Sequence, residues 1–232
     1  MEDSGRFDIF LQTGSDGLDR PEFQKFPKIP RFYRDIIITE KIDGTNAQVL
    51  VTEDGRVFAG SRNRWLASDQ PDNYGFRAWV EEHADELRQL GPGRHFGEWW
   101  GKGINRGYGL DHRRFSLFNV SRWQSLENSG HRLTKFERGE EVNIERTYPP
   151  ACCGVVPILY VGPWKKELDW GEEKNFVRDT LFDLGLYGSR AVLDFMRPEG
   201  IVIYHTAGHC LFKVTFEGDQ PKGKRNDPAT TR

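Results

Sequence analysis

The sequence is poor in cysteine and has no long apolar run. Its 232 residues include only three cysteines, Cys152, Cys153 and Cys210. An odd number with two adjacent members provides neither a disulfide framework nor the spacing of a zinc site, so we expect reduced thiols and a cytoplasmic protein. No segment is apolar for long enough to cross a membrane and nothing resembles a signal peptide, so we expect no membrane partner.

The sequence also lacks an excess of charge of either sign and any internal repeat. The formal net charge is −2 and the isoelectric point is about 6.3, which excludes a global basic field. Any contact with nucleic acid must therefore come from a local basic surface. The chain is long enough for one sizeable core. We expect an N-terminal extension over residues 1–22, one domain over 23–217 and a flexible polar tail over 218–232.

The segment from Glu40 to Asn46 is the most informative part of the sequence. It follows the apolar residues 36–38, which predict a buried strand, and a second strand is predicted over residues 47–51. Lys41 is then placed at the end of a strand, beside a tight turn at Asp43-Gly44, where a ligand can approach. Burial generally lowers the pKa of a lysine amine and makes its nucleophilic form accessible. Taken alone, a surface lysine beside a hairpin turn explains the segment equally well.

Four further charged residues are candidates for binding or catalysis. Arg62 follows a strand over 56–59, and its planar guanidinium suits a phosphate, although a surface salt bridge is the alternative. Glu98 lies among aromatic residues and glycines, where a carboxylate is costly to bury without a partner. Glu199 precedes an apolar strand at 201–204. Lys213 belongs to an alternating strand over 211–216.

The rest of the sequence predicts both helices and strands. Helical spacing of apolar residues predicts helices over 73–90 and 172–187. Further strands are predicted over 114–120 and 155–161, and residues 121–147 are expected to be irregular.

Taken in order, these motifs resemble the covalent nucleotidyltransferase superfamily, which comprises ATP-dependent DNA ligases, RNA ligases and mRNA capping enzymes. The nucleophile motif of that superfamily, Lys-x-Asp-Gly, is matched by residues 41–44. The flanking Glu40 and Thr45-Asn46 resemble the RNA ligase branch, which contains phage RNA ligase 2 and the RNA-editing ligases. The resemblance extends over about residues 23–216. It implies an α+β fold of the ATP-grasp-like kind, with two antiparallel sheets packed face to face, helices outside and the nucleotide between. It corresponds to the adenylyltransferase domain alone.

The resemblance also implies roles for individual residues. Lys41 would be the nucleophile, Lys213 a catalytic cation at the α-phosphate, and Glu199 a ligand of the catalytic divalent cation. Phe118, in the predicted strand 114–120, would stack on adenine. The expected cofactors are ATP and Mg²⁺ or Mn²⁺. The residues expected to bind the nucleotide are Glu40, Asn46, Arg62, Glu98 and Phe118.

One motif departs from the family pattern of Lys-x-Lys. Either Lys213 is the first lysine and Thr215 replaces the second, or Lys213 is the second and Leu211 replaces the first. The expected function is an ATP-dependent RNA ligase that joins 5′-phosphate and 3′-hydroxyl ends of nicked or broken RNA, RNA–DNA hybrids included, through a lysyl-AMP intermediate. A DNA ligase, a capping-type guanylyltransferase and a non-catalytic nucleic-acid-binding relative remain as alternatives.

Overall fold

The computed structural model describes residues 11–13, 19–21, 23, 25–167 and 173–218. Two compact units are distinguished, residues 1–31 and 32–232. The first unit contains a hairpin of β1 (Leu11–Thr13) and β2 (Asp19–Pro21). Of the tail expected over 218–232, only Gly218 lies within the described residues.

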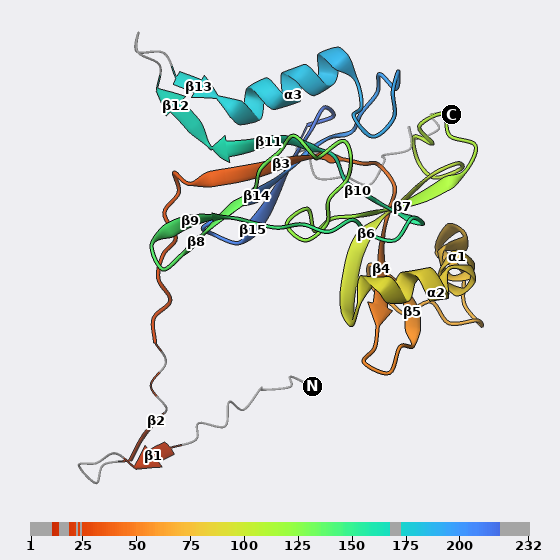
Figure 1. Ribbon diagram of the computed structural model, residues 1–232, viewed down its shortest axis with the longest axis horizontal. Coiled ribbons are helices and arrows are strands. Elements are labelled where there is room, and N and C mark those ends of the chain that lie inside the picture. The colour runs from red at the N-terminus through yellow and green to blue at the C-terminus, as the bar shows by residue number, and fades with distance from the viewer. Residues whose placement is uncertain (1–10, 14–18, 22, 24, 168–172, 219–232) are drawn as a thin grey trace, which may run out of the picture. The chain divides into compact units, whose positions relative to one another are not determined.

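The second unit is an α+β fold built on two main sheets (Figure 1). The five-stranded sheet has the order β10-β7-β6-β4-β5, and the four-stranded sheet has the order β11-β3-β14-β15. Neighbouring strands are antiparallel except β10 and β7. The α+β class and the antiparallel sheets agree with the prediction. The strands are β3 (Asp35–Lys41), β4 (Thr45–Val51), β5 (Val57–Ser61), β6 (Gly93–Gly101), β7 (Arg113–Leu117), β10 (Cys153–Val155), β11 (Ile158–Pro163), β14 (Gly200–His205) and β15 (Cys210–Thr215).

The four-stranded sheet is covered on one face by α3 (Phe176–Tyr187). Since side chains alternate along a strand, Ile36 and Ile38 point to this face, where they pack with Leu184 of α3. The other face of β3 carries Ile37, Thr39 and Lys41. This alternation decides which residues of β3 are available to a ligand.

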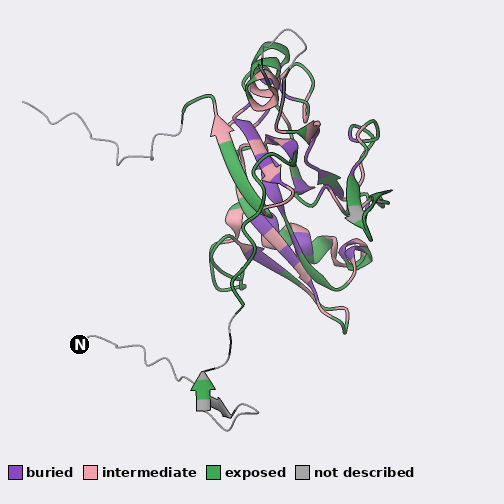
Figure 2. Ribbon diagram, turned by 90° about the vertical axis from the view of Figure 1, so that its left-hand side faces the viewer, coloured by how far each residue is buried: buried purple, intermediate pink, exposed green. Residues whose placement is uncertain are grey.

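The five-stranded sheet packs one face against the helical segment 73–90. That face contributes Val49, Trp99 and Phe115 to the larger core, and the helical segment contributes Phe76 and Leu87. Figure 2 shows that the buried residues follow the inner strands of the second unit. The opposite face of this sheet is the one that carries Asn46 and Glu98, which are paired in register.

Two predicted elements are interrupted. The helix predicted over 73–90 consists of four short pieces, because Tyr74 has a positive φ of 55° and His83 has non-helical angles. The strand predicted over 155–161 is two strands in different sheets, since the chain leaves β10 and joins β11 across Val156-Pro157. The helical pieces are η1 (Asn73–Gly75), α1 (Phe76–Glu82), α2 (Ala84–Leu87) and η2 (Arg88–Leu90).

Smaller differences concern element ends and surface hairpins. The strand predicted over 114–120 ends at Leu117, and α3 begins at Phe176, where the Asn175 side chain caps it by accepting the Arg178 N–H. The irregular segment 121–147 contains a hairpin of β8 (Thr134–Glu137) and β9 (Glu140–Asn143). A further hairpin joins β12 (Lys165–Glu167) and β13 (Glu173–Asn175). Among the described helices, none has the length and apolar character needed to span a membrane.

Candidate active site

Lys41 lies where the chain passes from one sheet to the other. β3 ends at Lys41 and β4 begins at Thr45, but these strands belong to different sheets, so residues 42–44 form a crossing and not a hairpin turn. Gly44 is required there, because a Cβ at this position would lie 2.5 Å from the Trp99 carbonyl oxygen and 2.7 Å from the Trp100 Cβ. The crossing therefore brings Lys41 between the sheets on a closely packed backbone.

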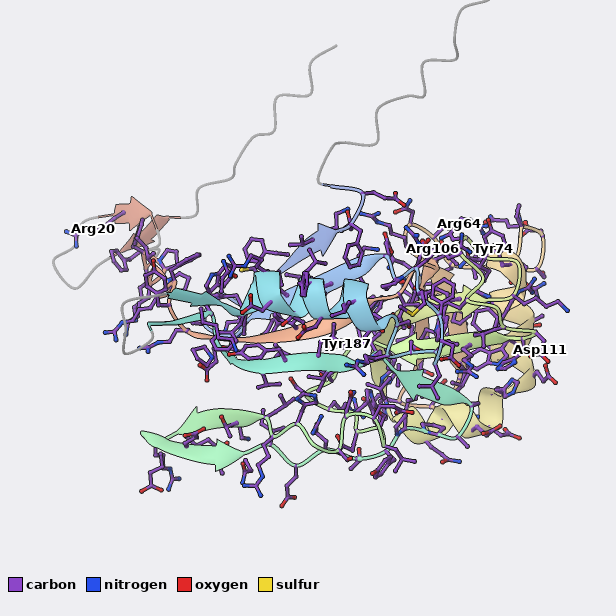
Figure 3. The ribbon with its side chains drawn as sticks, turned by 90° about the horizontal axis from the view of Figure 1, so that it is seen from above. Arg20, Arg64, Tyr74, Arg106, Asp111 and Tyr187 are labelled. Atoms are coloured by element: carbon purple, nitrogen blue, oxygen red, sulfur yellow. The ribbon has the colours of Figure 1, made fainter. Side chains whose placement is uncertain are left out.

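The crossing is fixed by side chains of the loop 102–109. The Tyr108 hydroxyl accepts the Asp43 N–H at 2.8 Å. Asn105 Nδ2 donates to Asp43 Oδ1 at 2.9 Å and to the Gly44 carbonyl oxygen at 2.6 Å. Arg106, labelled in Figure 3, forms ion pairs with Asp43 at 2.9 Å and Glu217 at 2.6 Å. These contacts hold Asp43 and Gly44, and with them the backbone next to Lys41, in place. The sequence prediction missed them, and the glycine-rich composition of 103–109 was the only signal.

A cavity of about 840 Å³ lies beside Lys41 and is lined from both sheets. β3 contributes Thr39 and Lys41, while β14 and β15 contribute Val202 and Leu211. Its volume falls within the range of pockets that bind small molecules. Six of the eight residues selected from the sequence border it: Glu40, Lys41, Asn46, Arg62, Glu98 and Phe118.

Glu98 is the buried carboxylate of this cavity. Its Oε1 accepts the Gly44 N–H at 3.1 Å and its Oε2 accepts Asn46 Nδ2 at 3.1 Å. Burial raises the pKa of Glu98 to about 7, and the negative charge of Glu199 adds to this effect, while the positive charge of Lys41 opposes it. Glu98 is thus a hydrogen-bond acceptor whose charge is poorly compensated.

Glu199 lies directly beside the candidate nucleophile. Gly200, at the start of β14, is paired in register with Lys41, and this places the Glu199 Oε2 atom 2.6 Å from Lys41 Nζ. Both side chains are half-buried. Within the described part of the chain, no cluster of three or more His, Cys, Asp or Glu residues is gathered for a metal ion. Glu199 therefore stands as a single carboxylate next to a cation.

The Glu40 carboxylate is directed away from the cavity. It accepts hydrogen bonds from the Ser189 hydroxyl at 2.6 Å, the Arg190 N–H at 2.7 Å and the Ala191 N–H at 3.1 Å. The side chain lies on the α3 face of β3 because it alternates with Lys41, and the residue is only 1% exposed. The Glu40 carboxylate therefore tethers β3 to the segment 189–191, although the residue borders the cavity.

Two aromatic side chains line the cavity on the five-stranded sheet. Phe118, selected from the sequence, is partly exposed, and so is Phe96, which the prediction missed. The Phe118 N–H donates to the Phe96 carbonyl oxygen at 3.0 Å, so the two residues are neighbours across adjacent chain segments. Their exposed rings supply an apolar, flat surface within the cavity.

The two remaining cations differ in their relation to the cavity. Arg62 is exposed at its border, and no hydrogen bond or ion pair is formed by its side chain among the described residues. Lys213 is exposed and is paired in register with Val202, which places it on the same sheet face as Lys41, but it does not line the cavity. Lys41, Gly200 and Thr215 are paired in register across β3, β14 and β15, and we call such a set of paired residues a row.

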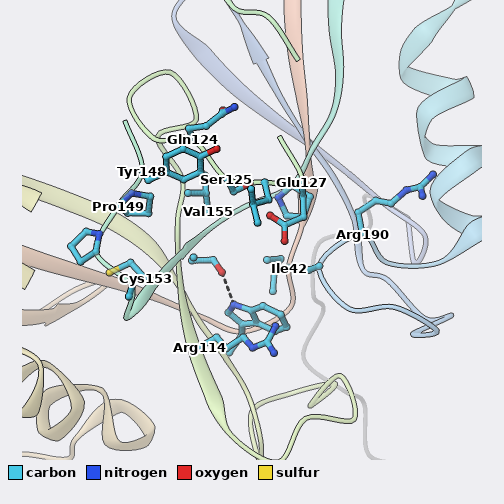
Figure 4. Close-up of a pocket in the computed structure, with 18 residues that line it drawn as sticks. Ile42, Arg114, Gln124, Ser125, Glu127, Tyr148, Pro149, Cys153, Val155 and Arg190 are labelled. Carbon is cyan, nitrogen blue, oxygen red and sulfur yellow. Dashed lines mark hydrogen bonds between the residues drawn. The ribbon is translucent and has the colours of Figure 1, made fainter. Parts of the chain in front are cut away.

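A second cavity of about 350 Å³ lies on the other side of Ile42 (Figure 4). At its floor the Trp100 indole N–H donates to the Ser116 hydroxyl at 2.9 Å. The Arg190 side chain points away from this cavity in Figure 4. None of the eight residues selected from the sequence lines it, so the larger cavity is the candidate active site.

One protein family matches most of this chain. The family model described as RNA ligase matches residues 34–215. A search of curated proteins finds no match. Among solved structures, a mutant of the Naegleria gruberi RNA ligase with ATP and Mn matches with 15% identity and a TM-score of 0.47. A second mutant of that ligase, in the apo form, matches with 16% identity and a TM-score of 0.45. Each match covers 78% of this chain and 49% of the other, so the chain spans about half the length of these solved structures.

Proposed function

The chain belongs to the RNA ligase family, and we propose that it uses ATP to join 5′-phosphate and 3′-hydroxyl ends of RNA through a lysyl-AMP intermediate on Lys41. One observation carries the proposal. Lys41 borders a cavity of nucleotide size, with Glu98 on the opposite wall and Glu199 within hydrogen-bond distance. Broken or nicked RNA, RNA–DNA hybrids included, is the proposed substrate. Since all three cysteines are free, we place the reaction in the cytoplasm.

The first step of the proposal is attack of Lys41 Nζ on the α-phosphorus of ATP. A phosphorus–nitrogen bond forms as the bond to the pyrophosphate oxygen breaks. The attacking amine must be neutral, and Glu199 Oε2 at 2.6 Å is the acceptor placed to receive its proton. In the following steps AMP is transferred to the 5′-phosphate of the RNA, and the 3′-hydroxyl then displaces AMP to form the phosphodiester bond.

The cavity offers a partner for each part of the nucleotide. Phe118 and Phe96 supply flat apolar surface for the base. Glu98 supplies carboxylate oxygens for the ribose hydroxyls, and Asn46 holds that carboxylate through its side-chain amide. Arg62 has donors available for phosphate. Lys213, on the same sheet face as Lys41, supplies a cation for the transferring phosphoryl group.

A divalent cation fits this site on the basis of charge. Burial is the main cause of the raised pKa of Glu98, and the charges of Lys41 and Glu199 act on it in opposite directions, so two carboxylates and one amine interact in this part of the site. Mg²⁺ is commonly held by one or two carboxylates together with substrate phosphates and water. Glu199 would hold the ion, and Mg²⁺ or Mn²⁺ would supply charge neutralisation at the phosphates.

Incubation with ATP labelled at the α-phosphate and Mg²⁺ or Mn²⁺, followed by denaturing electrophoresis, tests the proposal. We expect an acid-labile label on the wild-type protein and none on Lys41→Ala. Label from GTP in preference to ATP would favour a capping-type enzyme. Nicked substrates that differ only in ribose or deoxyribose at the 3′-terminal nucleotides complete the test, since equal or better sealing of the all-DNA nick would favour a DNA ligase.

The second candidate is an RNA-binding relative without catalytic activity. The observation in its favour is Thr215, which occupies the row of Lys41 and Gly200 where the family pattern allows a second lysine. Such a protein would bind RNA but form no labelled adduct in the same experiment.

A further inference from the structure

Exposed aromatic and arginine side chains gather on the open face of the five-stranded sheet, away from Lys41. Phe58 and Arg94 are both paired in register with Leu50, so the three residues form one row across β5, β4 and β6. Trp65 is bridged to the neighbouring Gly60. We call Phe58, Trp65, Arg94 and the adjacent Arg56 the outer patch. Phe58 is 41% exposed and Trp65 is 43% exposed, although both are large apolar side chains.

The rings of the outer patch are held by guanidinium groups and by each other. The Arg94 guanidinium lies 5.1 Å from the centre of the Trp65 ring, and the Arg56 guanidinium lies 5.7 Å from the centre of the Phe58 ring. The Phe58 and Trp65 rings are 6.4 Å apart, edge to face. Cation–π contacts of this kind orient the rings without burying them. The patch is therefore an ordered surface that still has apolar ring area available to a ligand.

The outer patch is continuous with the candidate active site. Arg94 belongs to the outer patch and also lines the large cavity. Phe96 and Arg62 line the cavity beside it. Along β6 the row of Glu98 is followed by the row of Phe96 and then by the row of Arg94. Since a strand rises about 3.4 Å per residue, the distance along β6 from Glu98 to Arg94 is about 14 Å. This is on the order of the length of four stacked nucleotides. A strand that reaches the cavity can thus extend over the patch.

The charges of this face favour a polyanion. Among the described residues, no carboxylate is within ion-pair distance of Arg62 or Arg94, and Arg94 donates only to the Gln48 side-chain oxygen, at 3.2 Å. Arg56 is paired with Asp54 at 2.8 Å, and Glu53 stands exposed in the same turn. Arginines without carboxylate partners, alternating with exposed rings, are the composition of surfaces that bind single-stranded nucleic acid through stacking and phosphate contacts.

We propose that the outer patch binds unpaired RNA, with bases stacked on Phe58 and Trp65 and phosphates on Arg94 and Arg62. This site rests on the proposed function, and it extends that function to a second contact region for the substrate. A single strand is specified because the bases of a duplex are already stacked on each other and are not available to the rings.

The test is binding of fluorescently labelled RNA to the Lys41→Ala protein, in which the proposed chemistry cannot change the ligand. Polarisation is measured for a single strand and for a blunt duplex of the same sequence. In this background we expect Phe58→Ala and Trp65→Ala each to weaken single-strand binding about tenfold and duplex binding much less. Phe182→Ala, which removes a more exposed ring on α3 (67% exposed), is the control and should bind as the parent does. Arg94→Gln should reduce the salt dependence of binding by about one phosphate contact.

Two outcomes overturn the assignment, provided that urea unfolding shows the variants to be folded. One is unchanged single-strand binding in both ring variants, and the other is an equal loss for single strand and duplex. Lys41 adenylylation, measured separately in the wild-type background, distinguishes this failure from failure of the proposed function. If the wild type is labelled and the ring variants bind RNA as the parent does, the ligase proposal stands and the assignment of the outer patch is wrong. If the ring variants lose RNA binding but the wild type is not labelled, the assignment of the outer patch stands and the ligase proposal is wrong.

Discussion

Lys41 Nζ and Glu199 Oε2 lie 2.6 Å apart, although the two residues are 158 positions apart in the sequence. Their proximity follows from sheet order, because β3 and β14 are neighbours and Lys41 is in register with Gly200. Nucleophilic attack needs the neutral amine, so the Lys41 proton must pass to an acceptor, and Glu199 Oε2 lies within hydrogen-bond distance of it. The charge of Glu199 is therefore expected to control the reactivity of Lys41.

We expect Glu199→Gln to slow formation of the labelled lysine adduct by about 10²-fold, because the charged group next to the reacting centre is lost while its shape is kept. The rate is measured in a single turnover at saturating ATP. Glu81→Gln, which alters an exposed carboxylate on α1, is the control and should label at the wild-type rate. A wild-type rate in Glu199→Gln would mean that Glu199 has no part in this step.

The raised pKa of Glu98 predicts a pH-dependent stability in the absence of metal and nucleotide. Since its pKa rises from 4.5 to about 7 on folding, the contribution of Glu98 to stability is fully present below pH 4.5 and is lost as the pH rises through about 7. Between pH 5 and pH 8, we expect the wild type to lose up to about 3 kcal/mol relative to Glu98→Gln. Urea unfolding of both proteins measures this difference. A difference that does not vary with pH would contradict the prediction.

The sequence predicted the main strands because alternation and apolar runs are local signals, whereas the fold class was predicted from the family resemblance of the motifs. It could not show that Asp43-Gly44 joins strands of different sheets, since a crossing and a hairpin turn have the same local composition. It also could not show that 155–161 is divided between two sheets. Sheet membership depends on contacts between distant segments, which a local pattern does not contain.

The candidate site was predicted to a similar extent. The motif residues Lys41, Glu98 and Phe118 do border one cavity. The tether formed by the Glu40 carboxylate was not predicted, because the motif does not express that alternation turns the Glu40 and Lys41 side chains to opposite faces of β3. Tyr108 was missed, because its role lies in one long-range hydrogen bond to the Asp43 backbone.

Glu40 is expected to act through stability and position. Glu40→Ala removes a buried carboxylate. The Ser189 hydroxyl and two backbone N–H groups then lose the oxygen atoms to which they donate hydrogen bonds. We expect a loss of about 3 kcal/mol in the free energy of unfolding, measured in urea. Glu81→Ala, at an exposed position, should change it by less than about 0.5 kcal/mol. If the two variants lose equal stability, the tether to 189–191 contributes nothing.

The last prediction concerns the single lysine of β15. Lys213 is one row away from the row of Lys41, Gly200 and Thr215, and all of these residues share the cavity-side face of the sheet. A cation there should act most strongly where charge is redistributed in the transition state, so we expect Lys213→Ala to slow adenylylation more than it weakens ATP binding. Thr215→Lys would place a second cation in the row of Lys41, at the cost of one hydrogen bond to the Gly218 carbonyl oxygen, and we expect it to speed adenylylation about tenfold. Single-turnover labelling at saturating ATP gives both rates, and ATP binding is measured separately on the Lys41→Ala background. If Lys213→Ala labels at the wild-type rate, Lys213 is only a strand residue. If Thr215→Lys has no effect, the missing second lysine is not what limits the chemistry of this site.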